Sequence, residues 1–294
     1  MLSLKYKRLY IIGNGFDLHY GIKSSYKDYL EYLEGVDSGL FDLLLTLFPA
    51  SLWKDFESSL GDLAPGSLNE DCFCLIVHDD ESDFAWERES ASWNYHYAAM
   101  KKELDVARIE SSFREWVAQI DISRVKPDSV ISDSEDTLYL TFNYTRTLED
   151  CFGIDPHRIL HIHGEVGDDR LIFGHAPIVD KKIMRPQQYY EQDMLEDLRS
   201  LFIDRTEKPV VPMLLQNYTW FESLRNVEEV VVSGFSFSPV DLPYIRRVKS
   251  CVKPDSEWKV FVRNDATLIN IPVVGSAEAL RYPCSLFYES NILF

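Results

Sequence analysis

The sequence predicts a doubly wound α/β fold, in which helices cover both faces of a mainly parallel sheet. Short runs of apolar, β-branched and aromatic residues recur along the chain, as in strands that are buried on both faces. Segments with apolar residues at helical spacing alternate with these runs, which favours parallel strands joined by helices. Four runs end in glycine or polar residues, in the segments GNG, FNY, HIHG and SGFS. Because ligands of such sheets bind at the carboxyl ends of the strands, we expect any functional site there.

Six strands are expected where an apolar run stops at a glycine or a polar turn. They cover residues 9–12, 137–142, 158–163, 171–173, 229–233 and 258–262. The first is typical of a strand inside a parallel sheet, because LYII is apolar without interruption and Gly13 follows it directly. The fourth is the shortest, since Gly174 follows only the three residues LIF.

Helices are expected where apolar residues recur every three or four positions. The segment SYKD, from Ser25, matches a capping box, so a helix should begin there and end near Gly35. Further helices are expected over residues 40–48, 52–63, 93–120, 187–202 and 212–224, and from residue 241.

The domain organisation follows from a change in composition after the first helix. Residues 36–125 are expected to form a helical insertion or cap, and residues 1–35 and 126–294 the α/β core. Within the insertion, the acidic run HDDESD lacks helical periodicity and predicts a solvated loop near residues 78–92. The sequence leaves open whether this loop acts as a lid, mimics the charge of a nucleic acid or is plain surface.

Composition narrows the classes of function. The 294 residues hold 48 Asp and Glu against 30 Lys and Arg, a net charge of −18, so the chain should repel phosphate backbones, and no basic run offsets this. We therefore expect no direct binding of nucleic acid. The five cysteines form no CxxC pair, which argues against a zinc ribbon and favours reduced thiols. With neither a signal peptide nor a membrane-spanning stretch in the sequence, we expect a cytoplasmic protein without membrane contact.

The first candidate motif is the turn GNGFD, which follows the first strand. It consists of Gly13, Asn14, Gly15, Phe16 and Asp17. The two glycines would let the backbone approach a ligand closely, and the N–H groups that follow could receive a pyrophosphate. Leu18 stands where the dinucleotide fingerprint GxGxxG has its last glycine, so a tight strand-to-helix turn is an equal alternative.

The next candidates end the second and third strands. Asn143 offers a donor and an acceptor that could orient a ribose hydroxyl or a water, unless it bonds its own backbone. His161 and His163 share one face of a strand, and the one that projects beyond its end could act as a general base. We expect His161, the deeper one, to be packed and hydrogen-bonded. The two could instead bind a metal ion, completed by His175 or Asp241.

Three weaker candidates have ordinary structural explanations. The segment SGFS, which contains Gly234 and Ser236, places small residues at a strand end. Asp241 precedes Leu242 and Pro243 as the N-cap of a helix would. Glu57 follows Phe56 on a helix and could border a pocket, although a solvated glutamate is the commoner outcome. Neither a GxSxG elbow nor a Walker loop occurs, which argues against an α/β-hydrolase and a P-loop NTPase.

In this order the motifs resemble the NAD site of sirtuins. The segment IGNG followed by GI resembles the first sirtuin loop, TFNY the Thr-x-Asn-hydrophobic motif, His163-Gly164 the catalytic His-Gly, and SGFS the later loop on the adenosine side. More closely, the set resembles the AbiH family of phage abortive-infection proteins, in the sirtuin-like superfamily. The matching segments are IIGNGFDLHYGIKSSYKDYL, WKDFESSLG, LTFNYTRTLE, ILHIHG, FGH and VVSGFSFSPVDLPYI.

The resemblance implies a Rossmann-like core that binds NAD, or a related nucleotide, as ligand or substrate, and hydrolysis of its nicotinamide–ribose bond in phage defence. It gives Asn143 and His163 the catalytic roles, with Asp17 or Glu57 stabilising positive charge. The nucleotide would be held by Gly13, Asn14, Gly15, Phe16, Asp17, Gly234, Ser236 and Asp241. The sirtuin zinc cysteines and the acidic-Phe-Arg end of the first loop are missing, so neither a metal nor protein deacylation is expected.

Two other functions stay open on the sequence. The site could bind a nucleotide without turnover, as a sensing or partner-binding module. A metal-dependent hydrolase could be built on His161, His163 and His175. The expected partner is a small-molecule nucleotide, and a second copy of the chain or another defence protein is left open.

Overall fold

The computed structural model describes residues 6–63, 102, 104–177, 190–262 and 268–282. The chain divides into two compact units, and each is described by itself. The first holds Met1–Ser25, Val117–Ile172 and Pro209–Phe294, and the second holds Tyr26–Trp116 and Phe173–Lys208. The second unit thus begins before the predicted insertion of residues 36–125 and includes a later segment of the chain. The acidic loop predicted near residues 78–92 lies outside the described residues.

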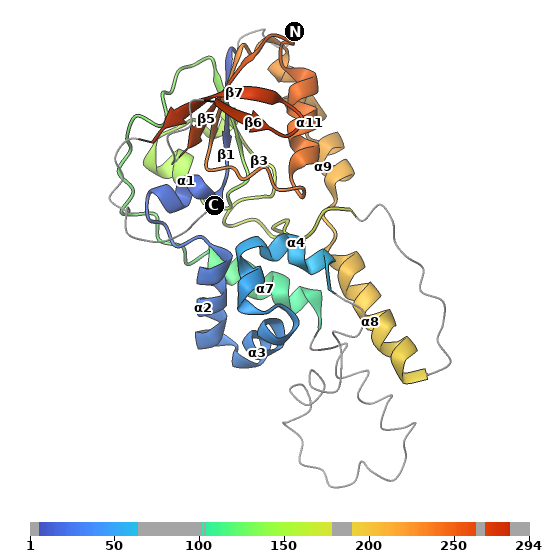
Figure 1. The fold of residues 1–294 in the computed structure, drawn as a ribbon. Coiled ribbons are helices and arrows are strands. Elements are labelled where there is room, and N and C mark those ends of the chain that lie inside the picture. The colour runs from blue at the N-terminus through green and yellow to red at the C-terminus, as the bar shows by residue number, and fades with distance from the viewer. Residues whose placement is uncertain (1–5, 64–101, 103, 178–189, 263–267, 283–294) are drawn as a thin grey trace, which may run out of the picture. The chain divides into compact units, whose positions relative to one another are not determined.

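The first unit contains a seven-stranded sheet in the order β3-β2-β1-β4-β5-β7-β6 (Figure 1). The strands are β1 (Arg8–Ile12), β2 (Thr137–Thr141), β3 (Ile159–His161), β4 (Glu229–Ser233), β5 (Glu257–Val262), β6 (Leu268–Ile271) and β7 (Gly275–Arg281). Neighbouring strands are parallel except β6, which runs antiparallel to β7. The predicted doubly wound, mainly parallel α/β fold is therefore confirmed.

Helices cover both faces of this sheet because the strands are apolar on both sides. On one face, Leu9 and Ile11 of β1 pack with side chains of α9 (Val210–Gln216), α10 (Tyr218–Glu222) and α11 (Leu242–Cys251). On the other, Tyr10 and Ile12 pack with Phe16 of α1 (Asn14–His19) and with the π-helical turn η3 (Thr147–Cys151). Figure 1 shows α1 and α11 on opposite sides of the sheet. Two short 3-10 turns, η4 (Pro156–Arg158) and η5 (Ser223–Asn226), complete this unit's described helical elements.

The prediction of a strand over residues 171–173 is wrong. Leu171 and Phe173 are buried, as the apolar run suggested, but the segment joins no sheet. Its backbone is used in a loop instead, where the Ile172 N–H donates to the His163 oxygen at 2.8 Å and the Tyr144 hydroxyl donates to the Ile172 oxygen at 2.9 Å. Burial of this run therefore comes from loop packing and not from strand pairing.

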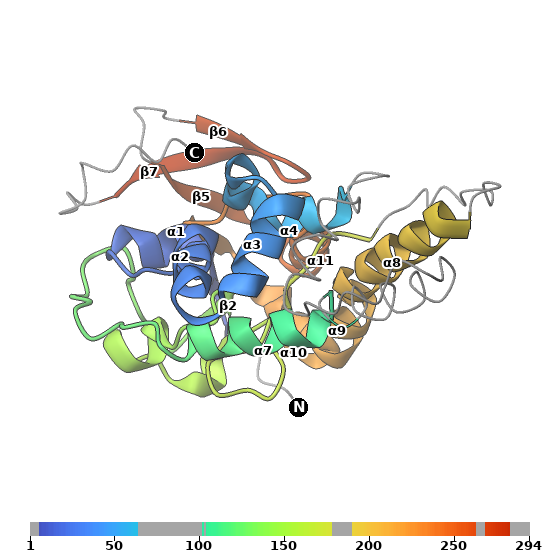
Figure 2. The same cartoon turned by 90° about the horizontal axis from the view of Figure 1, so that it is seen from below.

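The second unit is helical in its described part. Its helices are α2 (Tyr26–Val36), α3 (Ser38–Leu47), the 3-10 segment η1 (Ala50–Asp55), α4 (Phe56–Gly61), α7 (Val106–Val117) and α8 (Tyr190–Thr206). Asp37 caps α3 by accepting the Leu40 N–H at 3.0 Å, and Arg108 of α7 (Figure 2) donates two hydrogen bonds to the same carboxylate. The rings of Tyr29 and Phe113 pack edge to face in its core.

Two further predictions can be compared with these helices. The helix expected over residues 52–63 is split, because its first part is 3-10 and only the part from Phe56 is α-helical. The helix expected over residues 93–120 is described from residue 106 as α7. None of the helices in the described ranges combines the length and the apolar composition needed to cross a bilayer.

Candidate functional site

The glycine turn after β1 is built by close packing of two strand ends. The N–H groups of Gly13 and Gly15 donate to the oxygens of Ser233 and Gly234 at 3.0 and 2.8 Å. A Cβ atom at Gly13 would lie 2.6 Å from the Gly234 oxygen, and one at Gly15 would lie 2.8 Å from the Gly234 Cα. The Phe16 N–H donates to the Gly13 oxygen at 2.9 Å. Backbone contact thus explains why glycine is needed at these positions. The N–H groups of Gly15 and Phe16, which could have received a pyrophosphate, are already hydrogen-bonded to main-chain oxygens.

Asp17, on α1, is a buried carboxyl group with a raised pKa. It is fully buried, and its Oδ2 accepts the Thr145 hydroxyl at 2.5 Å, while Oδ1 has no hydrogen-bond partner. Burial raises the pKa of Asp17 to about 6, and the polar side chains of Thr145, Thr147 and Asn143 nearby oppose that rise. A carboxyl group of this pKa changes its charge close to neutral pH, which is common in catalytic sites.

Asn143 places a second buried acceptor beside Asp17. It lies two residues beyond β2 and is 6% exposed, and its main-chain N–H donates to the Thr141 hydroxyl at 3.1 Å. Its side-chain Oδ1 is buried without a hydrogen-bond partner, so the carboxamide oxygen does not bond its own backbone. The side chain lies close enough to Asp17 to lower the pKa of that carboxyl group. Asp17 Oδ1 and Asn143 Oδ1 are therefore two neighbouring acceptors that hydroxyl donors would satisfy.

His163 lies beyond the end of β3 and faces a carboxylate. It is 2% exposed, and its Nε2 is 3.6 Å from Asp241 Oδ1. The rings of Phe142 and Tyr244 pack edge-on against it, with centroids at 5.3 and 5.6 Å. Asp241 occupies the predicted N-cap position of α11 but makes no side-chain capping bond there. This separation is longer than a hydrogen bond, so the two side chains interact through charge when His163 is protonated.

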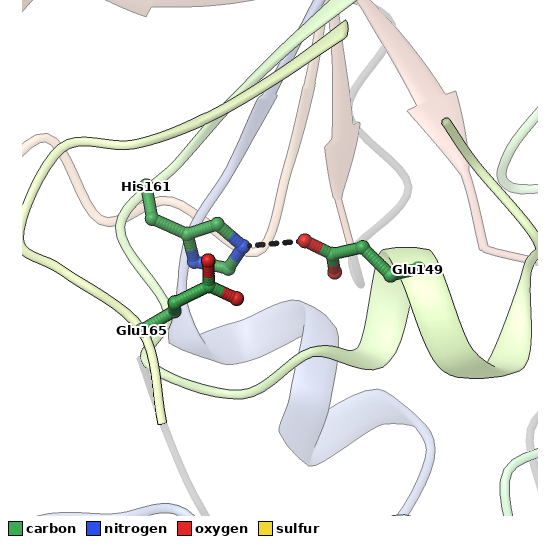
Figure 3. A group of neighbouring side chains, drawn as sticks. All are labelled: Glu149, His161 and Glu165. Carbon is green, nitrogen blue, oxygen red and sulfur yellow. Dashed lines mark hydrogen bonds and ion pairs between the residues drawn. The ribbon is translucent and has the colours of Figure 1, made fainter. Parts of the chain in front are cut away.

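His161 is hydrogen-bonded on both ring nitrogens, as the sequence predicts, but it is not the deeper histidine, because His163 is the more buried of the two. Its Nδ1 is 2.9 Å from the Asn143 main-chain oxygen, and its Nε2 is 2.9 Å from Glu149 Oε1 (Figure 3). Burial acts to lower the pKa of His161, but the hydrogen bond and charge of Glu149 outweigh it and raise that pKa. Conversely, burial acts to raise the pKa of Glu149, and His161 overcomes it and lowers that pKa.

Asn14, Ser236 and Gly234 occupy more open or strained positions. Asn14 exchanges hydrogen bonds with Ser24, at 3.0 and 2.6 Å, on the surface. Ser236 is exposed, in a loop in which Gly234 and Phe237 have φ angles of +67° and +55°. A left-handed conformation is strained for a bulky residue such as Phe237 and is often found at functional loops.

Glu57 and His175 lie in the second unit, so they form no described part of the site above. Glu57 is not a solvated glutamate, because the fully buried Lys208 ammonium lies 3.0 Å from its carboxylate. The His175 ring nitrogens face the main-chain oxygens of Ala176 and Ile203 at 2.7 and 2.8 Å. Both side chains are thus tied within their own unit.

Within the described part of the chain, His161 and His163 belong to the first unit and His175 to the second, so a metal set of these three would draw on both units. The group there whose ligand atoms all lie within 4.8 Å of one another is Glu149, His161 and Glu165 (Figure 3).

The sequence reasoning missed Thr145, Thr147 and Glu149, which contact Asp17 or His161. All three lie in the segment NYTRTLE, where polar residues alternate after the end of β2. Strand alternation could have indicated Thr145, but Thr147 and Glu149 lie in the π-helical turn η3, where the period of two does not hold.

The comparisons with known proteins agree with the motif order. The family model described as "Bacteriophage abortive infection AbiH" matches residues 9–262, which is most of the chain. A search of curated proteins finds no match.

Proposed function

Because the chain belongs to the AbiH family of bacteriophage abortive-infection proteins, we propose that it acts in phage defence by binding NAD or a related nucleotide and hydrolysing its nicotinamide–ribose bond. The family supplies the defence function, and the resemblance to sirtuins suggests the nucleotide. The observation that carries the chemistry is the pair of buried acceptors on Asp17 and Asn143, within the same unit as the His163–Asp241 pair.

The two acceptors suit a ribose better than a phosphate. Ribose hydroxyls donate hydrogen bonds, whereas phosphate oxygens accept them. A buried acceptor without a donor costs about 1–3 kcal/mol, so a bound diol that donates to both would recover much of that free energy. In the glycine turn, in contrast, the N–H groups of Gly13, Gly15 and Phe16 already bond to main-chain oxygens.

The proposed reaction breaks the glycosidic C–N bond, and its electron pair leaves with the nicotinamide ring. The ribose carbon then carries positive charge, as in other glycoside hydrolysis. Asp17, ionised above its pKa of about 6, stabilises that charge. A water adds to the ribose carbon and gives its proton to His163, while Asp241 orients the ring and stabilises the imidazolium that forms.

The test is to incubate the purified protein with NAD and to follow nicotinamide and ADP-ribose by chromatography. His163→Ala and Asn143→Ala should each lose about 100-fold or more in turnover, and Asp241→Asn less, since general base catalysis contributes 10²–10⁴-fold. His157→Ala is the matched control, because this histidine is exposed on η4. Full activity in His163→Ala would remove its role. Binding of NAD by calorimetry without turnover would favour the nucleotide-sensing alternative, and absence of both would reject the nucleotide.

A further inference from the structure

The proposed reaction does not use His161 or Glu149, although both lie beside Asn143. Each ring nitrogen of His161 faces a hydrogen-bond acceptor. Nδ1 lies 2.9 Å from the main-chain carbonyl oxygen of Asn143, and Nε2 lies 2.9 Å from the carboxylate of Glu149. Neither a carbonyl oxygen nor an ionised carboxylate can donate a hydrogen bond. A neutral histidine has one N–H donor and one acceptor nitrogen, so it can satisfy only one of these contacts. The other nitrogen would direct its lone pair at an oxygen. Both contacts are hydrogen bonds only when both nitrogens carry a proton.

We propose that His161 is a constitutively protonated positioning residue, an imidazolium that ties the main chain of Asn143 to Glu149 and so fixes the carboxamide of Asn143 in the site. Its effect on NAD cleavage rests on the proposed function, but its protonation and its hold on Asn143 do not. This gives His161 a different role from His163, whose Nε2 faces Asp241 at the longer distance of 3.6 Å.

The carboxylates around His161 favour its protonated form. Glu149 faces it from η3 and Glu165 from the turn after β3, and Asp17 of α1 lies close enough for His161 to lower its pKa. Arg146 forms an ion pair with Glu165. Above the pKa of Asp17, a protonated His161 and Arg146 carry two positive charges against the three negative charges of Glu149, Glu165 and Asp17. In support, the pKa of His161 is raised despite the burial that acts to lower it.

A divalent cation between Glu149, His161 and Glu165 fits this arrangement less well. The separation of 2.9 Å between His161 Nε2 and Glu149 Oε1 is that of a direct hydrogen bond. A metal ion would need the lone pair of Nε2 and would draw Glu165 away from Arg146. It would replace one positive charge by two beside a guanidinium group. A second proton on the His161 ring therefore accounts for both of its 2.9 Å contacts without a metal ion.

The experiment measures ring protonation directly. The full-length protein is labelled with 15N-histidine, and its ring nitrogens are followed by NMR from pH 6.5 to 8.5, without nucleotide. The His161 signals are assigned by His161→Gln and, independently, by connection to the His161 backbone amide. Both ring nitrogens should be protonated at pH 7.5, and neither EDTA nor added Zn²⁺ or Mn²⁺ should change their signals. A singly protonated ring at pH 7.5 would overturn the proposal, and so would a shift or broadening caused by the metals or by EDTA.

The positioning is measured in the same samples from the side-chain amide signals of Asn143. In the wild type they should be single, and they should be independent of pH from 7.5 upward, where Asp17 beside Asn143 is already ionised. Glu149→Gln removes the charge that favours the imidazolium, so His161 should lose a proton within this pH range and the Asn143 signals should move or broaden with it. Glu257→Gln, an exposed carboxylate of the same unit, should leave both residues unchanged. Unchanged Asn143 signals in Glu149→Gln would overturn the positioning role, and a wild type that does not cleave NAD would reject only the proposed function.

Discussion

Replacing Asp17 by asparagine should raise the stability of the protein at neutral pH. The carboxyl group is fully buried, and its pKa is raised from the ordinary 3.8 to about 6, with burial as the largest cause. The folded chain therefore holds this proton more tightly than the unfolded chain does. Between these two pKa values, the free energy of unfolding of the wild type falls as pH rises. Asparagine carries no charge, so the variant should not share that loss.

The size of the effect follows from the two pKa values. The difference between about 6 and 3.8 corresponds to about 3 kcal/mol at neutral pH, at 1.36 kcal/mol for each factor of ten in proton affinity. At pH 5 most of the folded chain still holds the proton, and the same linkage gives about 1.6 kcal/mol. An asparagine oxygen can accept the Thr145 hydroxyl as Asp17 Oδ2 does, so this hydrogen bond is kept. The difference in free energy of unfolding between the variant and the wild type should therefore increase by about 1.4 kcal/mol, in favour of the variant, from pH 5 to pH 7.5.

The assay is urea unfolding of wild type and Asp17→Asn at pH 5.0 and 7.5, followed by circular dichroism. Asp255→Asn is the matched control, because Asp255 is exposed in the same unit, and it should change the free energy of unfolding by less than about 0.5 kcal/mol at both pH values. A variant that is less stable than the wild type at pH 7.5 would refute the reasoning. So would an equal gain at both pH values, since the charge would then not be its source.

The remaining predictions concern backbone packing and a buried ion pair. Gly234 and Gly153 have nearly the same φ angles, +67° and +68°, but a Cβ at Gly234 would lie 1.9 Å from a backbone nitrogen, whereas one at Gly153 meets nothing within 4 Å. Gly153→Ala should cost about 1–2 kcal/mol and Gly234→Ala about 4 kcal/mol or more in thermal or urea unfolding, and equal costs would disprove the steric argument. Lys208→Met should cost about 3–5 kcal/mol because it removes the buried cation that faces the Glu57 carboxylate. The double variant with Glu57→Gln should recover most of that loss, and a double variant no more stable than the single one would show that the pair itself is not the cause.

Among the strands that the sequence predicts correctly, β1, β2 and β4 are buried on both faces along most of their length. β1 and β4 are such strands, and their pairing in register brings Ile12 beside Ser233 at the site. β6 and β7 were not predicted, because LINI and GSAEALR contain polar or small residues and show no continuous apolar run. The wrong strand at residues 171–173 shows the converse, since its residues are buried by loop contacts.

For the candidate site, the sequence predicts which residues lie at the strand ends, but it does not predict which side chains contact one another. Asn143 and His163 could be found because each follows an apolar run directly. Glu149 could not, since its contact with His161 requires the π-helical turn η3 to direct it toward β3. Asp241 was explained by its N-cap position, and only the structure shows that its side chain faces His163 instead of the helix end. Sequence spacing gives the position of a side chain along an element, whereas its partner depends on packing between elements.

The glycines of the turn after β1 do not by themselves indicate a bound nucleotide. Gly13, Gly15 and Gly234 are required by contact between two backbones, so they would be needed in a protein of this fold that binds no phosphate. Their substitution should reduce stability and nucleotide binding together, and cannot separate the two. A substitution of Asn143 can separate stability from nucleotide binding, because its carboxamide oxygen is buried and accepts no hydrogen bond in the folded chain. If Asn143→Ala keeps the stability of the wild type and loses NAD binding, the site recognises the ribose. If the variant keeps both the stability and the NAD binding of the wild type, Asn143 does not recognise the ribose. The glycine turn alone does not then support a nucleotide as the ligand.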